Sequence, residues 1–310
     1  MHRLHLRLAS LVLLAVAVFP LGGCLFRTRH VDRQLSNAPL KTASQADLIQ
    51  YINAQATAIR SLQATVDINA SVGDEKNSQV TDYSEIRGYV LLRKPAMLRL
   101  KGLMPLVRNT AFDMVSDGEQ FRLWIPTKNK FVMGANNFES LQPQHKLENL
   151  RPQHIYDALL LPEIGADGIA VLENGYETVL DARRHRVEQP DYQLAVIQRG
   201  PNGWYLSRKI EFSRTDLRPH QQQIFDLQGN VVTEVRYRDY KDYGGIEFPS
   251  GIEIDRPREG YDIALSIVKL ELNRALTDEQ FALEQPPGAE VVHMDQANSH
   301  ETKGSGGPER

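Results

Sequence analysis

The sequence is poor in cysteine, because Cys24 is the single thiol among 310 residues. One cysteine excludes an internal disulfide framework and excludes zinc or iron–sulfur sites built from several thiolates. Charge of one sign is not in large excess either, since 36 Lys and Arg stand against 39 Asp and Glu. A net charge of -3 gives no reason to expect a nucleic-acid partner.

Enzyme motifs are also missing. The sequence has no Gly-x-Ser-x-Gly elbow, no Walker loop, no dinucleotide fingerprint, and no His-Glu-x-x-His pair among its nine histidines. Ser266 and Lys269 have the Ser-x-x-Lys spacing of penicillin-recognising enzymes, but residues three apart on a strand point to opposite faces. We therefore expect no catalytic residues, no metal and no cofactor. An envelope hydrolase would need a nucleophile–base site that the sequence does not display.

A long uncharged stretch occurs only near the start, from Leu8 to Gly23, after Arg3 and Arg7. This order is typical of a secretory signal. The stretch ends in Leu21-Gly22-Gly23-Cys24, which resembles the lipobox of bacterial lipoproteins. The resemblance implies a signal peptide over residues 1–23 and acylation of Cys24 with fatty acids such as palmitate.

An uncleaved membrane anchor is the alternative, because the uncharged run continues to Phe26 and approaches the roughly 20 residues that span a bilayer. Pro20 and the glycine pair would weaken such a helix. In the lipoprotein interpretation, Leu25 follows the acylated cysteine where inner-membrane lipoproteins often carry aspartate. By resemblance, we expect a lipid anchor in the cell outer membrane, with the domain facing the periplasm.

The remainder divides into three parts. Residues 24–43 are polar and aperiodic, which predicts a tether close to the lipid. Residues 296–310 have the composition of a disordered tail. One folded domain is expected over residues 44–295.

Two helices are predicted in this domain. Ser44 and Asp47 form a capping-box-like start, and an apolar stripe then recurs at helical spacing as far as Leu62. A second helix fits residues 152–161, where Pro152 suits the first turn and Pro162 ends the pattern.

Strands account for most of the other residues. From Leu62 to Val72, apolar and polar residues alternate strictly, as in a strand with one buried face. A dozen or so strands follow this kind of pattern, with short turns such as Asp117-Gly118 that indicate antiparallel pairing. We predict an α+β fold, mainly β, whose large sheet curves strongly to avoid long open edges. A two-sheet sandwich is the alternative.

An unusual link joins two of the predicted strands. It reads Leu103-Met104-Pro105-Leu106, whereas turns usually carry Gly, Asn, Asp or Ser. An apolar link indicates either a loop folded beneath the sheet or a loop that meets a membrane or a partner. Three basic residues flank it and could contact anionic lipid head groups, namely Arg99, Lys101 and Arg108.

These features resemble the LolA/LolB superfamily of lipoprotein carriers over about residues 44–292. The resemblance rests on the opening helix, the long alternating strand, and the segments LLRKPAMLRLKGLMPLVRNTAFDMVSDGEQFRLWIP, YDIALSIVKLELNRAL, DEQFAL and PPGAEVV. It implies a half-barrel of eleven strands covered by helices, with a cavity for acyl chains. The membrane-bound member exposes a leucine in an Asn-Pro-Leu-Gly loop; Leu106 matches that leucine, while Met104 and Val107 differ from its neighbours.

The predicted acyl-chain cavity is lined by apolar residues of the first strands. These are Val66, Ile68, Val90, Leu92, Leu98, Leu100, Phe112, Met114, Leu123 and Ile125. The alternative for each of them is a place in a filled core. Leu103, Met104, Pro105 and Leu106 are predicted to form a membrane-insertion loop.

The resemblance leads to a functional hypothesis. We expect a monomeric, outer-membrane-tethered lipoprotein that binds acyl chains of lipoproteins or other lipids and helps transfer them into the membrane. Its partners would be membrane lipid, the lipidated cargo and a periplasmic carrier. The alternative is a structural or assembly lipoprotein of the envelope that binds a protein partner through the curved sheet.

Overall fold

The structure is a computed structural model that describes residues 34–74, 79–136 and 150–294. The predicted signal peptide (1–23), Cys24 and the predicted tail (296–310) lie outside the described residues. Within the described part of the chain, no helix is long and apolar enough to cross a membrane.

One sheet of fourteen strands dominates the described residues. The strands are β1 (Ser61–Asp74), β2 (Gln79–Arg93), β3 (Met97–Leu103), β4 (Thr110–Ser116), β5 (Gln120–Ile125), β6 (Lys130–Ala135), β7 (Ile169–Leu180), β8 (Arg186–Gly200), β9 (Gly203–Ser213), β10 (Pro219–Phe225), β11 (Val231–Asp242), β12 (Glu247–Arg256), β13 (Tyr261–Leu272) and β14 (Glu290–His293). In the described part of the chain, the helices are α2 (Gln45–Ala58) and α3 (Pro152–Leu159), with short 3-10 turns η2 (Pro126–Lys128) and η3 (Asp278–Phe281).

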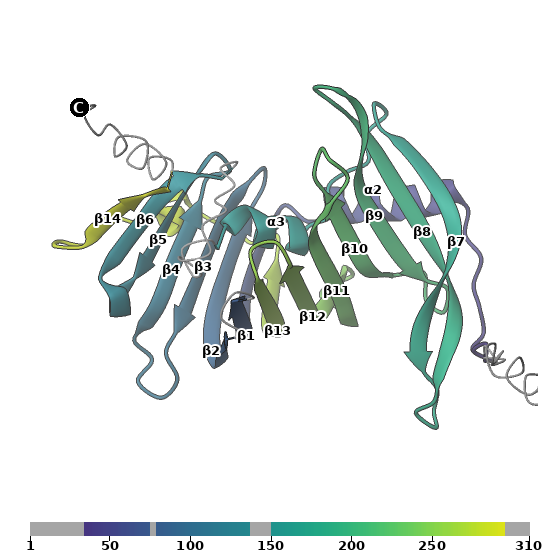
Figure 1. Ribbon diagram of the computed structural model, residues 1–310, viewed down its shortest axis with the longest axis horizontal. Coiled ribbons are helices and arrows are strands. Elements are labelled where there is room, and N and C mark those ends of the chain that lie inside the picture. Colours follow the sequence, from purple (N-terminus) through teal and green to yellow (C-terminus); the bar gives the residue numbers. More distant parts are fainter. Residues whose placement is uncertain (1–33, 75–78, 137–149, 295–310) are drawn as a thin grey trace, which may run out of the picture. The chain divides into compact units, whose positions relative to one another are not determined.

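The strand order is β14-β6-β5-β4-β3-β2-β1-β13-β12-β11-β10-β9-β8-β7 (Figure 1). The ladders from β6 through β1 and β13 to β8 are antiparallel, while β14 lies parallel to β6. The sheet stays open, since β14 and β7 end the order. The prediction of a mainly β, antiparallel, curved sheet is confirmed, and the two-sheet sandwich is not formed. Among residues 34–74, 79–136 and 150–294, the strands number fourteen rather than the eleven that the resemblance implied.

The described residues fall into two compact units. The smaller contains residues 34–37 and 178–189, where the chain forms a parallel bridge between Leu35 and Glu188. The larger contains residues 38–177 and 190–294 and holds both candidate sites described below.

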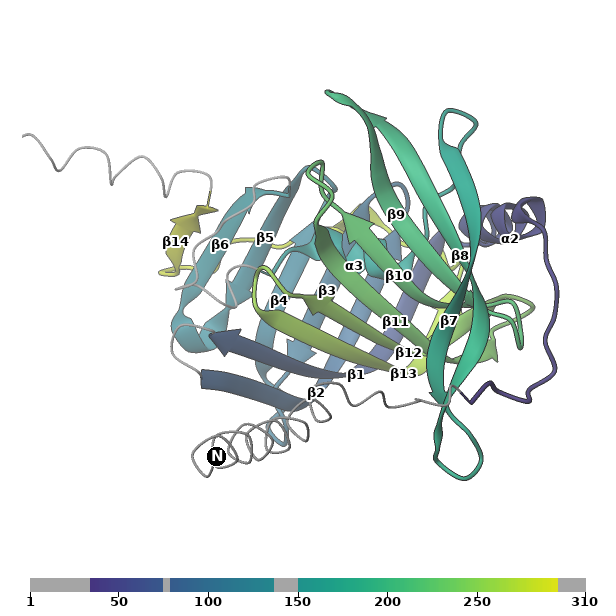
Figure 2. The ribbon, with the colours of Figure 1, turned by 45° about the vertical axis from the view of Figure 1, so that its right-hand side comes forward.

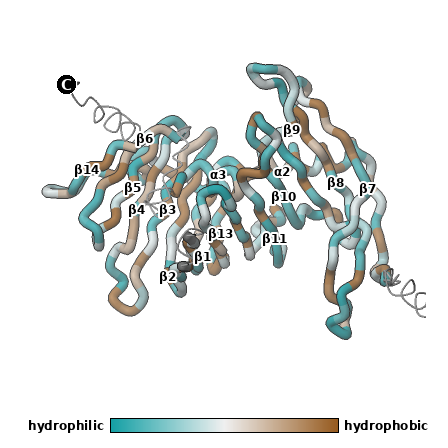
Figure 3. Tube along the Cα trace, viewed as in Figure 1, coloured by the Kyte–Doolittle hydropathy of each residue, from teal (hydrophilic) through white to brown (hydrophobic). Residues whose placement is uncertain are grey.

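The larger unit has its main core on one face of the sheet, which we call the inner face. Burial alternates along the strands, as in β3, where every second residue is buried, and hydropathy alternates with it (Figure 3). The inner-face core combines side chains of β1–β6 and β11–β13 with those of α3. Helix α3 contacts β3, β4 and β12, and Figure 2 shows it between the strands that curve around it.

The other helix, α2, packs against β8 and β9. Ser44 caps it through the predicted box with Asp47, and Leu48 and Ile52 are buried beside Tyr192, Leu194, Ile210 and Phe212. The helix ends at Ala58, earlier than predicted, because Ile59 is already extended. Ile59 and Leu62 therefore belong to the inner-face core and not to the stripe of the helix.

We expect Ile52→Ala to lower the free energy of unfolding by about 2–5 kcal/mol, since it leaves a cavity between α2 and the sheet. The side chain of Ile52 is 0% exposed. Urea unfolding followed by circular dichroism measures the change. Gln50→Ala is the matched control, because Gln50 lies on the exposed side of the same helix; an equal loss in both variants would contradict the packing of α2.

Candidate functional site

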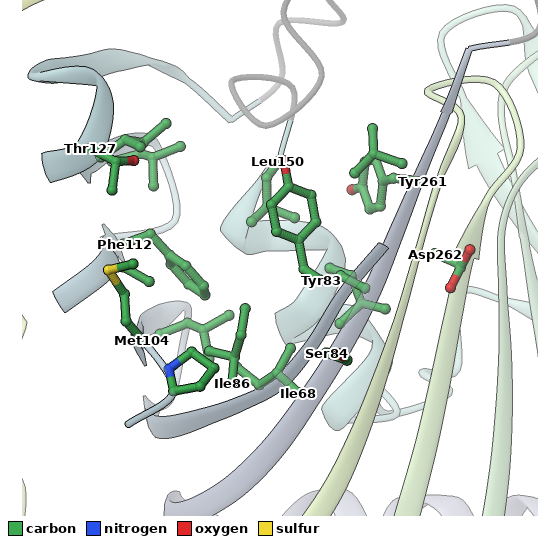
Figure 4. Close-up of a pocket in the computed structure, with 18 residues that line it drawn as sticks. Ile68, Tyr83, Ser84, Ile86, Met104, Phe112, Thr127, Leu150, Tyr261 and Asp262 are labelled. Carbon is green, nitrogen blue, oxygen red and sulfur yellow. The ribbon is translucent and has the colours of Figure 1, made fainter. Parts of the chain in front are cut away.

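An apolar cavity of about 250 Å³ opens on the inner face of the larger unit. Figure 4 shows side chains such as Phe112, Tyr83 and Leu150 around a common space, with Met104 and Pro105 contributed by the loop after β3, whereas Asp262 points away from it. The lining residues are mostly aliphatic or aromatic: Ile68, Ala70, Val72, Tyr83, Ser84, Ile86, Leu100, Met104, Pro105, Ala111, Phe112, Leu123, Ile125, Thr127, Leu150, Tyr261, Asp262 and Ile263. An apolar cavity of about 150 Å³ is enough to bind benzene, so this one suits part of a longer hydrocarbon.

Two glycines create room beneath this cavity. Gly88 on β2 and Gly102 on β3 are paired in register and lie on the inner face. A Cβ on Gly88 would stand 2.5 Å from Ile68 Cδ1, and one on Gly102 would stand 2.4 Å from Phe112 Cε1. The side chains of Ile68 and Phe112 therefore lie flat over bare backbone. A glycine inside a strand often marks such a close approach.

Irregular pairing accompanies the glycines. The β1–β2 register shifts between Ile68 and Ala70, and the β3–β4 register shifts between Gly102 and Leu103. Such bulges bend a strand and increase its twist. Both shifts lie at residues of the cavity or next to them, so the sheet bends where its inner face is hollow.

The loop between β3 and β4 forms part of the cavity wall and also projects into solvent. Met104 and Pro105 line the cavity, whereas Leu106 is 101% exposed. The amide of Val107 donates to the carbonyl of Pro105 at 2.8 Å, and Leu106 between them has φ 65°. This three-residue turn is strained for a residue with a Cβ. The loop thus holds an apolar side chain fully in water at a conformational cost, which is a pattern found at functional sites.

Polar groups are few in the cavity. Asp262 is the one lining residue with a carboxylate, but it is exposed and alternates along β13 with the buried Tyr261 and Ile263, so its carboxylate faces away from the cavity (Figure 4). The other polar lining side chains carry hydroxyls, namely Tyr83, Ser84, Thr127 and Tyr261. A site of this kind offers no nucleophile–base pair and favours a ligand that is mainly hydrocarbon.

Helix α3 lies next to the cavity and is tied to the sheet. Near its C-terminus, the carbonyls of Asp157 and Ala158 accept hydrogen bonds from Gln222 Nε2 (3.0 Å) and Tyr237 Oη (2.9 Å). These bonds satisfy two of the carbonyls that a helix end leaves unpaired. Side chains on the sheet therefore fix the position of the helix.

The other end of α3 meets the cavity wall. His154 Nδ1 lies 2.9 Å from the hydroxyl of Tyr261. Burial lowers the pKa of His154 well below 6.5, and the positive charges of Arg256 and Arg151 lower it further. The imidazole is therefore neutral in the folded protein at neutral pH.

The ten predicted cavity residues separate into two groups. Five of them line the cavity: Ile68, Leu100, Phe112, Leu123 and Ile125. The other five are at most 1% exposed and lie in the packed part of the inner-face core: Val66, Val90, Leu92, Leu98 and Met114. Of the predicted insertion loop, Leu103 ends β3, Met104 and Pro105 border the cavity, and Leu106 is the exposed residue.

Two of the basic residues expected to contact lipid head groups are bound within the protein. Arg99 donates from Nε and Nη2 to the carboxylate of Asp113, at 3.0 and 2.7 Å, and from Nη1 to the carbonyl of Gln280. Lys101 lies 4.0 Å from the same carboxylate. Odd-numbered positions of β3 face away from the cavity, and Arg108 is exposed in the loop. Contact of these residues with lipid head groups stays a prediction.

Sequence reasoning missed several residues of the cavity. Tyr83 and Ile86 on β2, Tyr261 and Ile263 on β13, and Leu150 before α3 all line it. Gly88 and Gly102 could have indicated the hollow, because each replaces an apolar residue at an inward position of an alternating strand.

Comparison with known proteins gives similar folds at low identity. No family model matches the chain, and no curated protein matches it. Similar solved structures include a LolA superfamily protein from Nitrosomonas europaea, with 16% identity, a TM-score of 0.44, and coverage of 76% of this chain and 97% of that one. A domain assigned to outer membrane lipoprotein sorting from Vibrio parahaemolyticus has 13% identity, a TM-score of 0.46, and coverage of 76% and 94%.

A third similar structure comes from Desulfovibrio piger and belongs to a family of unknown function. It has 15% identity, a TM-score of 0.47, and coverage of 76% of this chain and 95% of that one. The first structure belongs to the superfamily that the sequence resemblance implies, and the second has the role that it implies. At TM-scores below 0.5 the likeness carries no argument about function, so we argue the function from the cavity and the loop.

We expect Gly102→Ala to weaken binding of a fluorescent fatty acid by about four- to fifteen-fold. The new methyl group would push the ring of Phe112 into the cavity, and displacing one or two methylenes of ligand costs about 0.8 kcal/mol each. Fluorescence titration measures the affinity. Gly251→Ala is the control, because a Cβ there meets Arg238 no closer than 3.6 Å; equal affinity in both variants would contradict the assignment of the cavity.

We expect acid to weaken the attachment of α3 through His154. Its pKa is lower in the folded chain than in the unfolded chain, so the unfolded chain binds more protons, and stability present above about pH 6.5 is lost as the pH falls. The slope approaches about 1.4 kcal/mol per pH unit for one proton.

Thermal unfolding between pH 5 and pH 8 of the wild type and of His154→Gln tests this prediction. The variant keeps a polar group near Tyr261 but cannot titrate, and other groups such as Asp157 remain in both proteins. The stability difference between the two should change below about pH 6.5. A difference that is constant across the range would show that His154 does not titrate on unfolding.

Proposed function

We propose that this protein is a membrane-tethered carrier that accepts acyl chains of lipoproteins or other lipids and releases them into the outer membrane, facing the periplasm. The proposal rests on one observation: the loop that forms part of the apolar cavity wall also holds the fully exposed Leu106. Met104 and Pro105 border the cavity, and Leu106 follows them directly. A chain that leaves the cavity past these residues would reach the part of the loop best suited to enter a bilayer.

The energetics fit a carrier that uses no nucleotide. Each buried methylene contributes about 0.8 kcal/mol, so six carbons held in the cavity contribute about 5 kcal/mol. The hydrocarbon of a bilayer offers an equal or larger gain for the same carbons. Transfer can therefore proceed by exchange between two apolar environments, and the loop lowers the barrier by shielding the chain from water.

The anchor supports the same role. Acylation of Cys24, with residues 24–43 as a tether, would keep the domain close to the bilayer surface. Two or more acyl chains are needed for stable anchoring, and the lipobox resemblance implies that number. A tethered domain meets the membrane repeatedly, which suits a protein that hands over an apolar cargo there.

We expect Leu106→Glu to slow transfer of a fluorescent triacylated lipopeptide from the protein to liposomes by at least tenfold, while the melting temperature stays unchanged. A carboxylate at the loop tip cannot enter hydrocarbon without a large desolvation cost. Leu227→Glu is the matched control, because Leu227 is 50% exposed in the turn between β10 and β11 and lies outside the cavity lining. Unchanged transfer by Leu106→Glu would remove the loop from the mechanism.

A glycine variant separates the role of the loop from its stability. Glycine adopts positive φ without strain, so Leu106→Gly should keep the turn and the stability while it removes the apolar side chain. Slow transfer by a stable Leu106→Gly protein would support insertion of the leucine. Normal transfer would contradict it.

The assembly alternative keeps one specific observation in its favour. Strand β7 ends the sheet order, and its residues Ile169, Val171 and Tyr176 are 46%, 40% and 57% exposed. An edge strand with exposed apolar side chains can pair with a strand of another chain. Mass spectrometry of lipids that co-purify with the protein decides between the two: bound lipid supports the carrier, whereas a lipid-free protein in a stoichiometric complex supports assembly.

A further inference from the structure

A cluster of ionisable side chains lies across strands β7 to β10 of the larger unit, far along the sheet order from the apolar cavity. Glu177, Asp191, Glu211 and His220 come from β7, β8, β9 and β10 respectively. Their neighbours in sequence, Tyr192 and Phe212, face α2, so the cluster lies on the opposite face of the sheet. The side chain of Asp191 is 0% exposed, and the other three are 13–20% exposed.

Three buried side-chain atoms of this cluster have no geometrically sound hydrogen bond. Within the described residues, neither carboxylate oxygen of Asp191 has a hydrogen-bond partner, and His220 Nε2 has none. The two groups form an ion pair, with 3.5 Å between Nε2 and Oδ2. A buried polar atom without a hydrogen bond costs about 1–3 kcal/mol, so Asp191 Oδ1, which lies outside this ion pair, and the long contact within the pair both require an explanation.

The separation between His220 and Asp191 matches the edge of a tetrahedral metal site, and Glu211 lies close to both. One ligand atom each from Asp191, Glu211 and His220 lie within 4.8 Å of one another. With zinc bonds of about 2.0–2.1 Å, two ligands of a tetrahedron lie about 3.4 Å apart. The separation of 3.5 Å between Nε2 and Oδ2 is close to that edge.

The second ring nitrogen of His220 supports the same assignment. Its Nδ1 lies 3.4 Å from Glu177 Oε2. In zinc proteins a carboxylate commonly accepts the proton of the nitrogen that does not bind metal, which fixes the tautomer and the ring orientation. Glu177 stands where such an orienting group is needed.

A glycine on β7 allows the carboxylate to occupy this place. A Cβ on Gly175 would stand 2.4 Å from Asp191 Oδ1 and 2.3 Å from Gln193 Nε2. The carboxylate of Asp191 therefore lies directly against bare backbone. The charge of the cluster also favours a cation. Three carboxylates lie near only two basic side chains, His220 and Lys209, and Lys209 Nζ is 3.6 Å from Glu211 Oε1. A bound divalent cation would bring the net charge of the cluster closer to zero.

We propose that Asp191, Glu211 and His220 bind one divalent metal ion of the zinc class, with Glu177 as the residue that orients His220. Histidine with two carboxylates and an open fourth position is a ligand set that zinc accepts. The ion would join three neighbouring strands and stabilise the part of the sheet that carries α2. The site is independent of the proposed carrier function.

Isothermal titration of the full-length protein in detergent with ZnCl₂, after removal of metal with a chelator, tests the site. We expect one zinc ion per chain and a higher melting temperature with zinc. His220→Gln and Asp191→Asn should each weaken binding at least tenfold, and Glu177→Gln should weaken it about 10- to 100-fold. His185→Gln is the control, because His185 and Asp181 form an exposed ion pair of the same length, 3.5 Å; it should bind zinc as the wild type does.

Circular dichroism of each variant shows whether it folds. If Asp191→Asn does not fold, Glu177→Gln still decides, since it removes no metal ligand. A wild-type protein that binds no zinc, or that binds it equally well after His220→Gln or Glu177→Gln, would overturn the proposal. The cluster would then be an ion pair of His220 with its carboxylates.

Discussion

The hollow on the inner face depends on a contact between side chains and bare backbone. Ile68 and Phe112 lie over Gly88 and Gly102, where any Cβ would stand within 2.5 Å of them. Without this arrangement the two side chains would rise into the space above the sheet, and the inner face would be a filled core like its neighbouring part around Leu92 and Leu98. The bulges beside the glycines and the attachment of α3 keep the same region bent and covered.

The loop after β3 extends this arrangement to the protein surface. Its first residues complete the cavity wall, and its tip holds Leu106 in water at positive φ. One short segment thus connects a place that shelters hydrocarbon with a side chain suited to enter a bilayer. The charged cluster of β7–β10 lies in another part of the sheet. Its main feature is the buried carboxylate of Asp191, so it suits a cation and not hydrocarbon.

Local patterns in the sequence predicted the parts that local forces decide. Ser44 and Asp47 predict the start of α2, and the alternation of apolar and polar residues after Leu62 predicts β1. Both signals depend only on residues close in the sequence. The end of α2 and the strand β14 were missed, since Ile59 joins a core assembled from distant strands and β14 is only four residues long. Which apolar residues line a cavity depends on what covers them across several strands, so the ten predicted residues divided between cavity and core. The cluster around His220 was invisible because its members come from four strands.

The central claim is that an acyl chain occupies the hollow over Gly88 and Gly102. Photocrosslinking with a fatty acid that carries a diazirine near its methyl end, followed by peptide mass spectrometry, tests it directly. We predict crosslinks to inner-face residues such as Phe112, Leu123 and Ile263, and their loss under competition by unlabelled fatty acid. Crosslinks confined to the outer face, or labelling that competitor does not reduce, would contradict the account.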